Sequence, residues 1–157
     1  MQTAGKVLVT GGAGFIGTEL VEQLYKKGYE ITILDKQEKP IGLDHVKYIK
    51  SDLSSPARCV MACAGQDYVI HLAAKARIPE SFINPDEYFD SNVTGTRNIL
   101  TAASAVGIKK FVYAGSSSVY GNNTAPNKPT HKPDPLNYYA MSKLFGEHLC
   151  KQYKIMF

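Results

Sequence analysis

The eight residues TGGAGFIG, numbers 10–17, stand between a short apolar run and a segment with helical periodicity. Glycine permits a tight turn at this point, lets an anion approach the backbone and allows a helix to pack closely on the preceding strand. The N–H groups at the start of the following helix would face such an anion. The segment therefore predicts a pyrophosphate-binding turn between a strand and a helix or, in the simpler interpretation, a turn alone.

Short apolar runs alternate with helical segments along the whole chain. We predict strands at residues 6–10, 30–35, 46–50, 68–72 and 110–114, and helices at 14–27, 56–64, 86–106 and 138–153. This alternation predicts an α/β fold: a Rossmann-type, doubly wound parallel sheet with strand order 3-2-1-4-5 and helices on both faces. In such sheets a ligand binds at the carboxyl ends of the strands, where the strand order reverses.

An acidic residue, Asp35, ends the second predicted strand. Its distance along the chain from the glycine turn is typical of a carboxylate that accepts hydrogen bonds from adenosine ribose hydroxyls. A carboxylate there repels a 2′-phosphate, which favours NAD over NADP, although the neighbouring Lys36 could tolerate that phosphate. Alternatively, Asp35 only forms a turn at the strand end. Asp52 and Leu53 follow the third strand, where they either contact an adenine or form a turn.

The composition is that of one soluble globular domain, with 157 residues, 44% hydrophobic and 20% charged. The net charge of +4 is scattered along the chain, which indicates mild attraction for anionic ligands and no nucleic-acid partner. There is no apolar run of about 18 residues and no signal-peptide cleavage site, so we expect a cytoplasmic protein without a membrane partner. Three cysteines without a CxxC pair argue against a disulfide framework and against a metal site.

Tyr139 and Lys143 are four residues apart on the last predicted helix and therefore share one face. A tyrosine is a base only as a phenolate, and its ordinary pKa is about 10. A positive charge within about 4 to 6 Å lowers such a pKa by roughly 1 to 3 pH units, and Lys143 together with a nicotinamide ring would supply two charges. Taken alone, the same pair also fits a solvated helix face.

Seven motifs occur in the order and approximate spacing of one known group of enzymes. They are residues 10–17, Asp35, Asp52-Leu53, HLAA at 71–74, NVTGT at 92–96, SSSVYG at 116–121 and YAMSK at 139–143. From its first strand to its end, the chain resembles the extended short-chain dehydrogenases/reductases of the NAD-dependent epimerase/dehydratase family.

The resemblance implies a catalytic set and a set of NAD contacts. Tyr139 would be the acid/base, Lys143 would hold the nicotinamide ribose and favour the phenolate, and Ser116 would bond the sugar oxygen that becomes a carbonyl. The implied cofactor-binding residues are Gly11, Gly14, Phe15, Ile16, Gly17, Asp35, Lys36, Asp52, Leu53, Leu72, Ala73, Ala74, Lys75, Ser91, Tyr139 and Lys143. Phe15 and Ile16 would bind through their backbone amides.

Ser117 and Ser118 bear on the type of reaction. Relatives that eliminate water carry an acid or an acid pair in this region, and general acid catalysis is typically worth about 10² to 10⁴ in rate. The serines therefore make the chain resemble UDP-sugar 4-epimerases most, which implies NAD as cofactor, a UDP-sugar as substrate and a homodimer formed through the helices at 86–106 and 138–153. The alternatives are a dehydratase or reductase of the same family, or a non-catalytic NAD-binding sensor module.

Members of this group continue beyond the Tyr-Lys helix into further strands and a C-terminal segment that forms most of the sugar-nucleotide pocket. Here the chain ends at residues 154–157, where we expect the next strand to begin. We therefore expect residues 1–157 to form an NAD-binding Rossmann domain truncated before the substrate-binding segment, with the fifth strand as an open edge. Such a chain is an inactive fragment, a sensor module, or one part of a site that a partner chain completes. The loop at 121–137 is either a mobile lid or a spacer.

Overall fold

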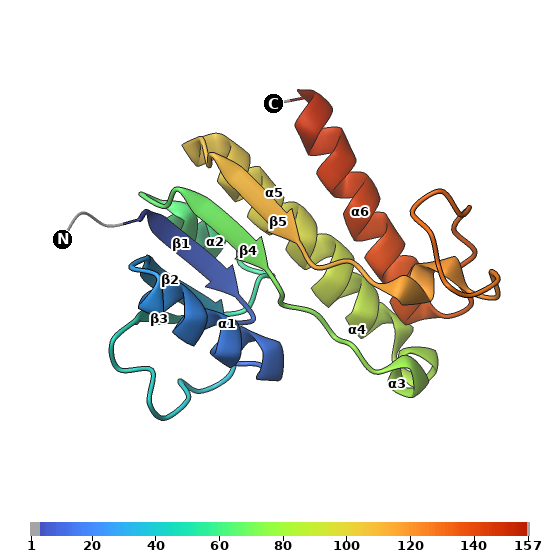
Figure 1. Ribbon diagram of the computed structural model, residues 1–157, viewed down its shortest axis with the longest axis horizontal. Helices are drawn as coiled ribbons and strands as arrows, with labels where there is room; N and C mark the ends of the chain where they lie inside the picture. Colours follow the sequence, from blue (N-terminus) through green and yellow to red (C-terminus); the bar gives the residue numbers. More distant parts are fainter. Residues whose placement is uncertain (1–3, 157) are drawn as a thin grey trace.

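The computed structural model describes residues 4–156, with side chains up to residue 154. Its centre is a sheet of five parallel strands in the order β3-β2-β1-β4-β5 (Figure 1). The strands are β1 (Lys6–Thr10), β2 (Glu30–Asp35), β3 (Lys47–Lys50), β4 (Tyr68–His71) and β5 (Lys110–Tyr113). The predicted fold class and strand order are confirmed.

Helices cover both faces of the sheet because successive side chains of a strand point to opposite sides. Val7 and Val9 of β1 pack with Val21 of helix α1 (Phe15–Lys26). Leu8, between them, belongs to a second cluster that includes residues of α2 (Pro56–Cys63) and α5 (Gly95–Val106). This near-continuous burial of β1 is what a parallel strand covered on both faces requires.

The register places the carboxyl ends of the central strands at one edge of the sheet. Thr10 lies opposite Leu34 of β2 on one side and opposite His71 of β4 on the other. The segments that leave these three strands therefore start close together. This is the edge at which the strand order reverses and where a ligand was expected.

The segment predicted as one helix at 86–106 is three elements in succession. They are α4 (Pro85–Phe89), a π-helical turn η1 (Asp90–Thr94) and α5. A shorter helix, α3 (Ile78–Ile83), precedes them, and a 3₁₀ turn η2 (Ser117–Tyr120) follows β5. A single widened turn leaves the apolar periodicity on both sides almost unchanged, so the sequence pattern does not reveal it.

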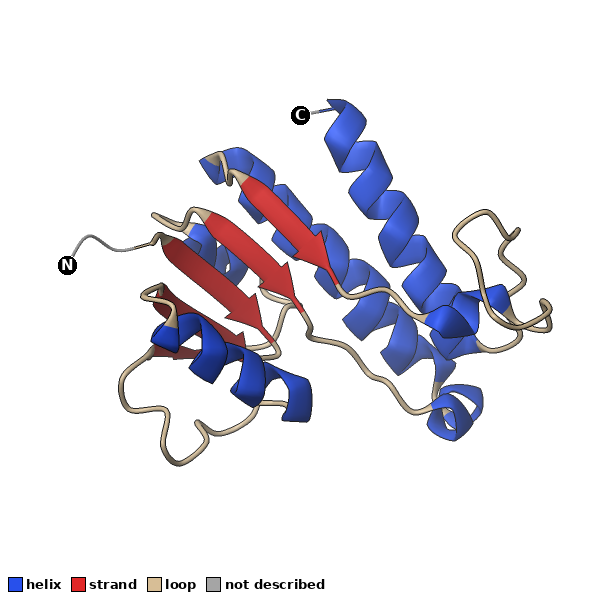
Figure 2. Cartoon of the chain, in the orientation of Figure 1, coloured by secondary structure: helices blue, strands red, loops and turns tan. Residues whose placement is uncertain are grey.

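The last helix is longer than predicted. Helix α6 runs over Tyr138–Met156, so the expected strand beginning at residue 154 is wrong; Phe157 lies outside the described residues. The reason is local, because Lys151, Gln152 and Lys154 favour helix and residues 147–156 contain neither glycine nor proline. In Figure 2, α6 lies beyond β5 and begins on the side where the strands end.

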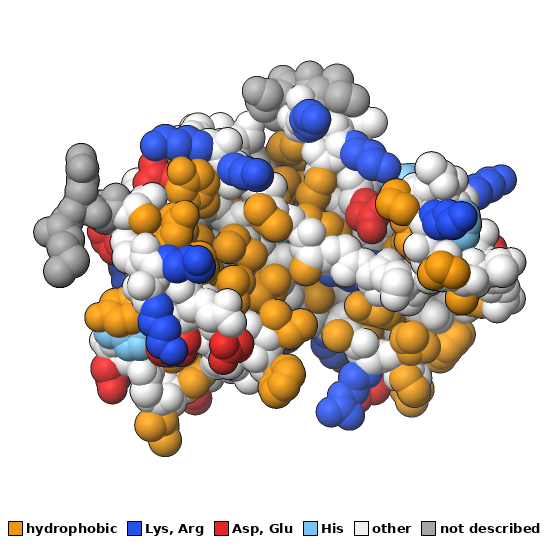
Figure 3. All heavy atoms as spheres, viewed as in Figure 1, with side chains coloured by type: hydrophobic (Ala, Val, Ile, Leu, Met, Phe, Trp, Pro, Cys, Tyr) orange, Lys and Arg blue, Asp and Glu red, His pale blue; other side chains and the backbone are white. Residues whose placement is uncertain are grey.

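Strand β5 forms one edge of the sheet and, among the described residues, pairs with β4 alone, as expected. Hydrophobic side chains gather over β1, β4 and β5 on the face of the molecule shown in Figure 3. Val112 of β5 is among the exposed large hydrophobic residues of the chain. No helix in the described part of the chain has the length and apolar character that a membrane crossing requires.

Candidate functional site

The glycine turn is packed too tightly to accept larger residues. Gly11 has a φ of +72°, and a Cβ added to it would lie 2.6 Å from the backbone nitrogen of Ala73. A Cβ added to Gly17 would strike the carbonyl oxygen of Gly11 and lie 2.7 Å from the Cα of Gly12. The turn is therefore wedged between the segment after β4 and the first turn of α1.

Helix α1 begins at Phe15, directly after the turn. The side chains of Phe15 and Ile16 are exposed, and their backbone lies in the first helical turn, whose N–H groups have no acceptor within the helix. Gly14 precedes the helix, and its N–H donates to the carbonyl of Gly11 at 3.1 Å. The residues for which a pyrophosphate-binding role was predicted thus surround one helix start.

The Asp35 carboxylate is fixed beside this turn by two backbone N–H groups. Ala13 donates to Oδ2 and Gln37 donates to Oδ1, each at 3.0 Å. The side chain is nearly buried, yet it lines a pocket at the end of the sheet. Each carboxylate oxygen retains further acceptor capacity, so Asp35 can accept hydrogen bonds from a ligand without losing those that hold it.

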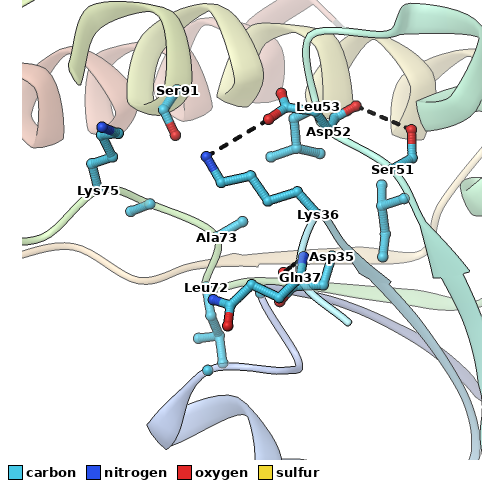
Figure 4. Close-up of a pocket in the computed structure, with 14 residues that line it drawn as sticks. Asp35, Lys36, Gln37, Ser51, Asp52, Leu53, Leu72, Ala73, Lys75 and Ser91 are labelled. Atoms are coloured by element: carbon cyan, nitrogen blue, oxygen red, sulfur yellow. Dashed lines mark hydrogen bonds and ion pairs between the residues drawn. The ribbon is translucent and has the colours of Figure 1, made fainter. Parts of the chain in front are cut away.

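One pocket collects most of the predicted cofactor-binding residues (Figure 4). It lies where the segments after β1, β2, β3 and β4 converge. Eleven predicted residues line it: Gly11, Gly14, Asp35, Lys36, Asp52, Leu53, Leu72, Ala73, Ala74, Lys75 and Ser91. Three further residues line the pocket and were not predicted: Leu34, Gln37 and Ser51. Each of them is adjacent in the sequence to a residue that was predicted. Phe15, Ile16, Gly17, Ser116, Tyr139 and Lys143 lie outside this lining.

Two ion pairs involve cations of the pocket lining. Lys36, directly after β2, extends toward Asp52 after β3, and its Nζ lies 3.8 Å from Oδ2 of that carboxylate (Figure 4). Lys75 on the opposite wall forms an ion pair with Glu87 of α4. Both cations of the pocket lining therefore face a carboxylate.

His71, at the end of β4, is completely buried and hydrogen-bonded at both ring nitrogens. Its Nδ1 lies 2.5 Å from Oγ1 of Thr10 and its Nε2 lies 2.9 Å from Oγ1 of Thr96. Because Thr96 donates its own proton to the carbonyl of Asn92, it accepts from Nε2, which assigns the proton of the neutral ring to Nε2. Burial, with a smaller contribution from the charge of Lys143, lowers the pKa of His71 to about 3.

Asn92, in the π-helical turn, joins the pocket wall to helix α6. Its Oδ1 accepts from the N–H of Lys75 at 2.8 Å, and its Nδ2 donates to the carbonyl of Lys75 and to Oγ of Ser142, each at 2.9 Å. Ser142 in turn donates to the carbonyl of Tyr139 at 2.8 Å. Asn92 was noted in the sequence only as part of a motif. The structure shows that its side chain links Lys75 to Ser142.

Of the predicted catalytic residues, Tyr139 and Lys143 lie on α6 and Ser116 lies directly before η2, which packs against α6. Lys143 is 4% exposed, and its Nζ lies 4.4 Å from the centre of the Tyr113 ring. Burial lowers the pKa of Lys143 to about 8, and the neighbouring Glu147 and Cys150 oppose this in part. A pKa of about 8 leaves the side chain mostly charged at neutral pH.

Tyr139 and Ser116 are partly buried. The Tyr139 ring meets the Tyr88 ring edge-on, with 6.4 Å between their centres. Oγ of Ser116 lies 2.7 Å from Oγ of Ser118 and accepts from the N–H of that residue at 3.2 Å. The hydroxyl of Ser116 is thus oriented by the 3₁₀ turn that follows it.

Comparisons with known proteins agree with this arrangement. The model of the NAD dependent epimerase/dehydratase family matches residues 7–156. UDP-glucose 4-epimerase 3 of Oryza sativa subsp. japonica is 36% identical over 163 residues, which cover 93% of this chain and 44% of that protein.

Two solved structures superpose closely. UDP-glucose 4-epimerase from Brucella ovis in complex with NAD gives a TM-score of 0.90 at 30% identity, covering 97% of this chain and 48% of the other. MoeE5 in complex with UDP-glucuronic acid and NAD gives 0.89 at 34% identity, covering 95% and 49%. The chain spans about half the length of these relatives.

Proposed function

The chain belongs to the NAD-dependent epimerase/dehydratase family, and we propose that residues 1–157 form the NAD-binding and proton-transferring part of a UDP-sugar 4-epimerase. The observation that carries this proposal is the Asp35 carboxylate. It is bonded to the glycine turn through Ala13 and faces the pocket at the carboxyl edge of the sheet.

The residues of the pocket fit an adenine dinucleotide. The glycine turn brings backbone N–H groups to the mouth of α1, where a pyrophosphate would be held. Asp35 offers acceptors to ribose hydroxyls, and Asp52 and Leu53 offer a polar edge and an apolar face to an adenine. Leu72 to Lys75 form the wall that leads toward α6, and Asn92 fixes the end of this wall.

Bound NAD supplies hydride transfer to and from C4 of a sugar. In the proposed mechanism, Tyr139 removes the proton of the 4-hydroxyl and later returns it to the same oxygen. Lys143, one helical turn after Tyr139 on the same face of α6, would hold the nicotinamide ribose. Ser116 donates a hydrogen bond to the sugar oxygen while that oxygen becomes a carbonyl.

The serines of η2 support epimerisation over elimination of water. Ser117 and Ser118 cannot protonate a leaving hydroxyl as a carboxylic acid does. Ser118 instead bonds the hydroxyl of Ser116. Ser118 therefore orients the hydroxyl of Ser116, and neither Ser117 nor Ser118 supplies a second acid.

The homodimer proposed from the resemblance is supported by exposed apolar residues on α4 and α6. Phe89 and Phe145 are 51% and 44% exposed, and their rings lie 6.3 Å apart, centre to centre. Met141, one helical turn before Phe145, is also exposed. Two copies that met along these helices would remove this surface from water.

The activity is tested with the protein together with any sequence that its reading frame encodes beyond residue 157. It is incubated with NAD and, in turn, with UDP-glucose, UDP-N-acetylglucosamine and UDP-glucuronic acid, and the products are separated by chromatography. We expect a 4-epimer from at least one of them, and a rate about 10² to 10⁴ lower for Tyr139→Phe.

The matched control is Tyr138→Phe, because Tyr138 is the adjacent tyrosine, is 48% exposed and lies off the face shared by Tyr139 and Lys143. It should retain the rate of the unmodified protein. Absence of a 4-epimer from all three sugar nucleotides would remove the proposal.

A further inference from the structure

The first position after Asp35 holds a cation that a 2′-phosphate could use, and its side chain is engaged elsewhere. Lys36 extends across the pocket to Asp52, with Nζ and Oδ2 3.8 Å apart (Figure 4). The backbone on either side of Lys36 is fixed, because Gln37 donates its N–H to Asp35 and accepts from the Tyr48 hydroxyl at 2.9 Å. A change of partner by Lys36 therefore requires a change of its side-chain rotamer only.

Asp52 is itself held in place for this contact. Its Oδ1 accepts from the N–H of Ser54 at 2.9 Å, within the turn after β3. The second carboxylate oxygen, Oδ2, is the one that faces Lys36. The acid is therefore presented by a short turn of the backbone, whereas the lysine reaches it through a long side chain.

The charges around the pocket disfavour an additional anion. Lys36 and Lys75 supply two positive charges, and Asp35, Asp52 and Glu87 supply three negative ones, which leaves one net negative charge. The hydrogen bond and the charge of Lys75 lower the pKa of the Glu87 carboxyl, and the charge of Lys36 lowers it by a smaller amount. A 2′-phosphate carries about two negative charges at neutral pH, so it would meet two paired cations and the unpaired Asp35.

We infer that Asp52 strengthens the preference of this site for NAD over NADP, because it holds Lys36 in an ion pair across the pocket and withholds it from a 2′-phosphate. The inference rests on the proposed function, since it presupposes that the pocket binds an adenine dinucleotide. Asp35 excludes the phosphate by its own charge, and Asp52 excludes it by occupying the cation that directly follows Asp35.

The test is Asp52→Asn, which removes the charge and keeps an oxygen that can accept from Ser54. Dissociation constants for NAD and NADP are measured by isothermal titration calorimetry at low ionic strength, and the result is their ratio, in which a loss of affinity common to both cofactors cancels. We expect the variant to shift the ratio toward NADP about tenfold, as expected when one mostly solvated cation becomes available to a phosphate.

Two further variants separate this effect from a general change of charge. Asp44→Asn removes a carboxylate from a similar pair, in which Lys39 and Asp44 lie 3.8 Å apart outside the pocket lining. It should leave the ratio unchanged. Adding Lys36→Met to Asp52→Asn should cancel the shift, because the freed cation is then absent. High salt should reduce the shift, since exposed charges are screened.

The possible results distinguish the inference from the function on which it rests. If the unmodified chain binds NAD and Asp52→Asn leaves the ratio unchanged, or shifts it equally without Lys36, the inference is wrong and the proposed function stands. If the folded, unmodified chain binds neither cofactor, both are wrong. Circular dichroism spectra that match between variants show that the comparison is made on folded protein.

Discussion

Acidification below about pH 6.5 should destabilise the folded chain through one buried side chain, His71. In the folded state burial lowers the pKa of this ring from 6.5 to about 3. Between these two values the unfolded chain binds a proton that the folded chain does not, so the free energy of unfolding decreases as the pH falls. The stability is complete above pH 6.5 and its loss ends near the folded pKa of about 3.

The size of this effect follows from the same two values. Each pH unit between them costs about 1.4 kcal/mol, so acidification from about pH 6.5 to about pH 5 should cost roughly 2 kcal/mol through His71 alone. This is a large part of the 5 to 15 kcal/mol, roughly, that stabilises an ordinary domain. Protonation at Nδ1 would also place a donor against the Thr10 hydroxyl, which now donates to that atom.

The assay is urea unfolding of the unmodified chain and of His71→Gln at about pH 7 and about pH 5, followed by circular dichroism. His45, His131 and His148 are common to both proteins, so their titration cancels in the comparison. We expect the variant to be less stable at neutral pH and to lose roughly 2 kcal/mol less than the unmodified chain on acidification. Equal losses in the two proteins would refute the assignment of a neutral, buried His71.

Three further substitutions test other parts of the structure. Gly17→Ala places a Cβ against the backbone of the turn and should lower the free energy of unfolding, measured with urea, by about 1 to 3 kcal/mol. The control is Gly14→Ala, whose Cβ would come no closer than 3.3 Å to the atoms around it and which should change this free energy little. Asn92→Ala should accelerate hydrogen exchange at the Lys75 amide, which loses its acceptor, and protection as strong as in the unmodified chain would contradict the link. Lys143→Met should raise the melting temperature at neutral pH, because burial lowers the pKa of Lys143 from 10.5 to about 8 and the buried charge therefore costs stability below about pH 8. That gain should shrink as the pH rises from about 8 toward 10.5, and a variant less stable than the unmodified chain at neutral pH would count against it.

The sheet and most of the pocket could be predicted because both depend on local signals. Each parallel strand is a short apolar run, and the residues directly after such runs converge once the strands align in parallel. Asp35 and Asp52 were found in this way, and Gln37 and Ser51 were missed although they lie beside them. A pattern of residue types identifies the strand end but not which of its neighbours turns toward the pocket.

The hydrogen-bonded links within the site could not be predicted. His71 joins Thr10 to Thr96, and Asn92 joins Lys75 to Ser142, over separations of 17 to 61 residues along the chain. Such pairs depend on the packing of elements, about which periodicity and spacing carry no information. The extension of α6 beyond residue 153 could have been predicted from local signals, because residues 151–154 include good helix formers. The strand expected there came from the family resemblance.

The proposed NAD site is tested by calorimetric titration of the purified chain with NAD, beside its Asp35→Asn variant. We expect saturable binding of one NAD per chain, weakened about tenfold in the variant because charge-assisted hydrogen bonds to the ribose are lost. A folded chain that gives no heat of binding with NAD would contradict the proposed NAD site, and so would a variant that binds NAD as tightly as the unmodified protein.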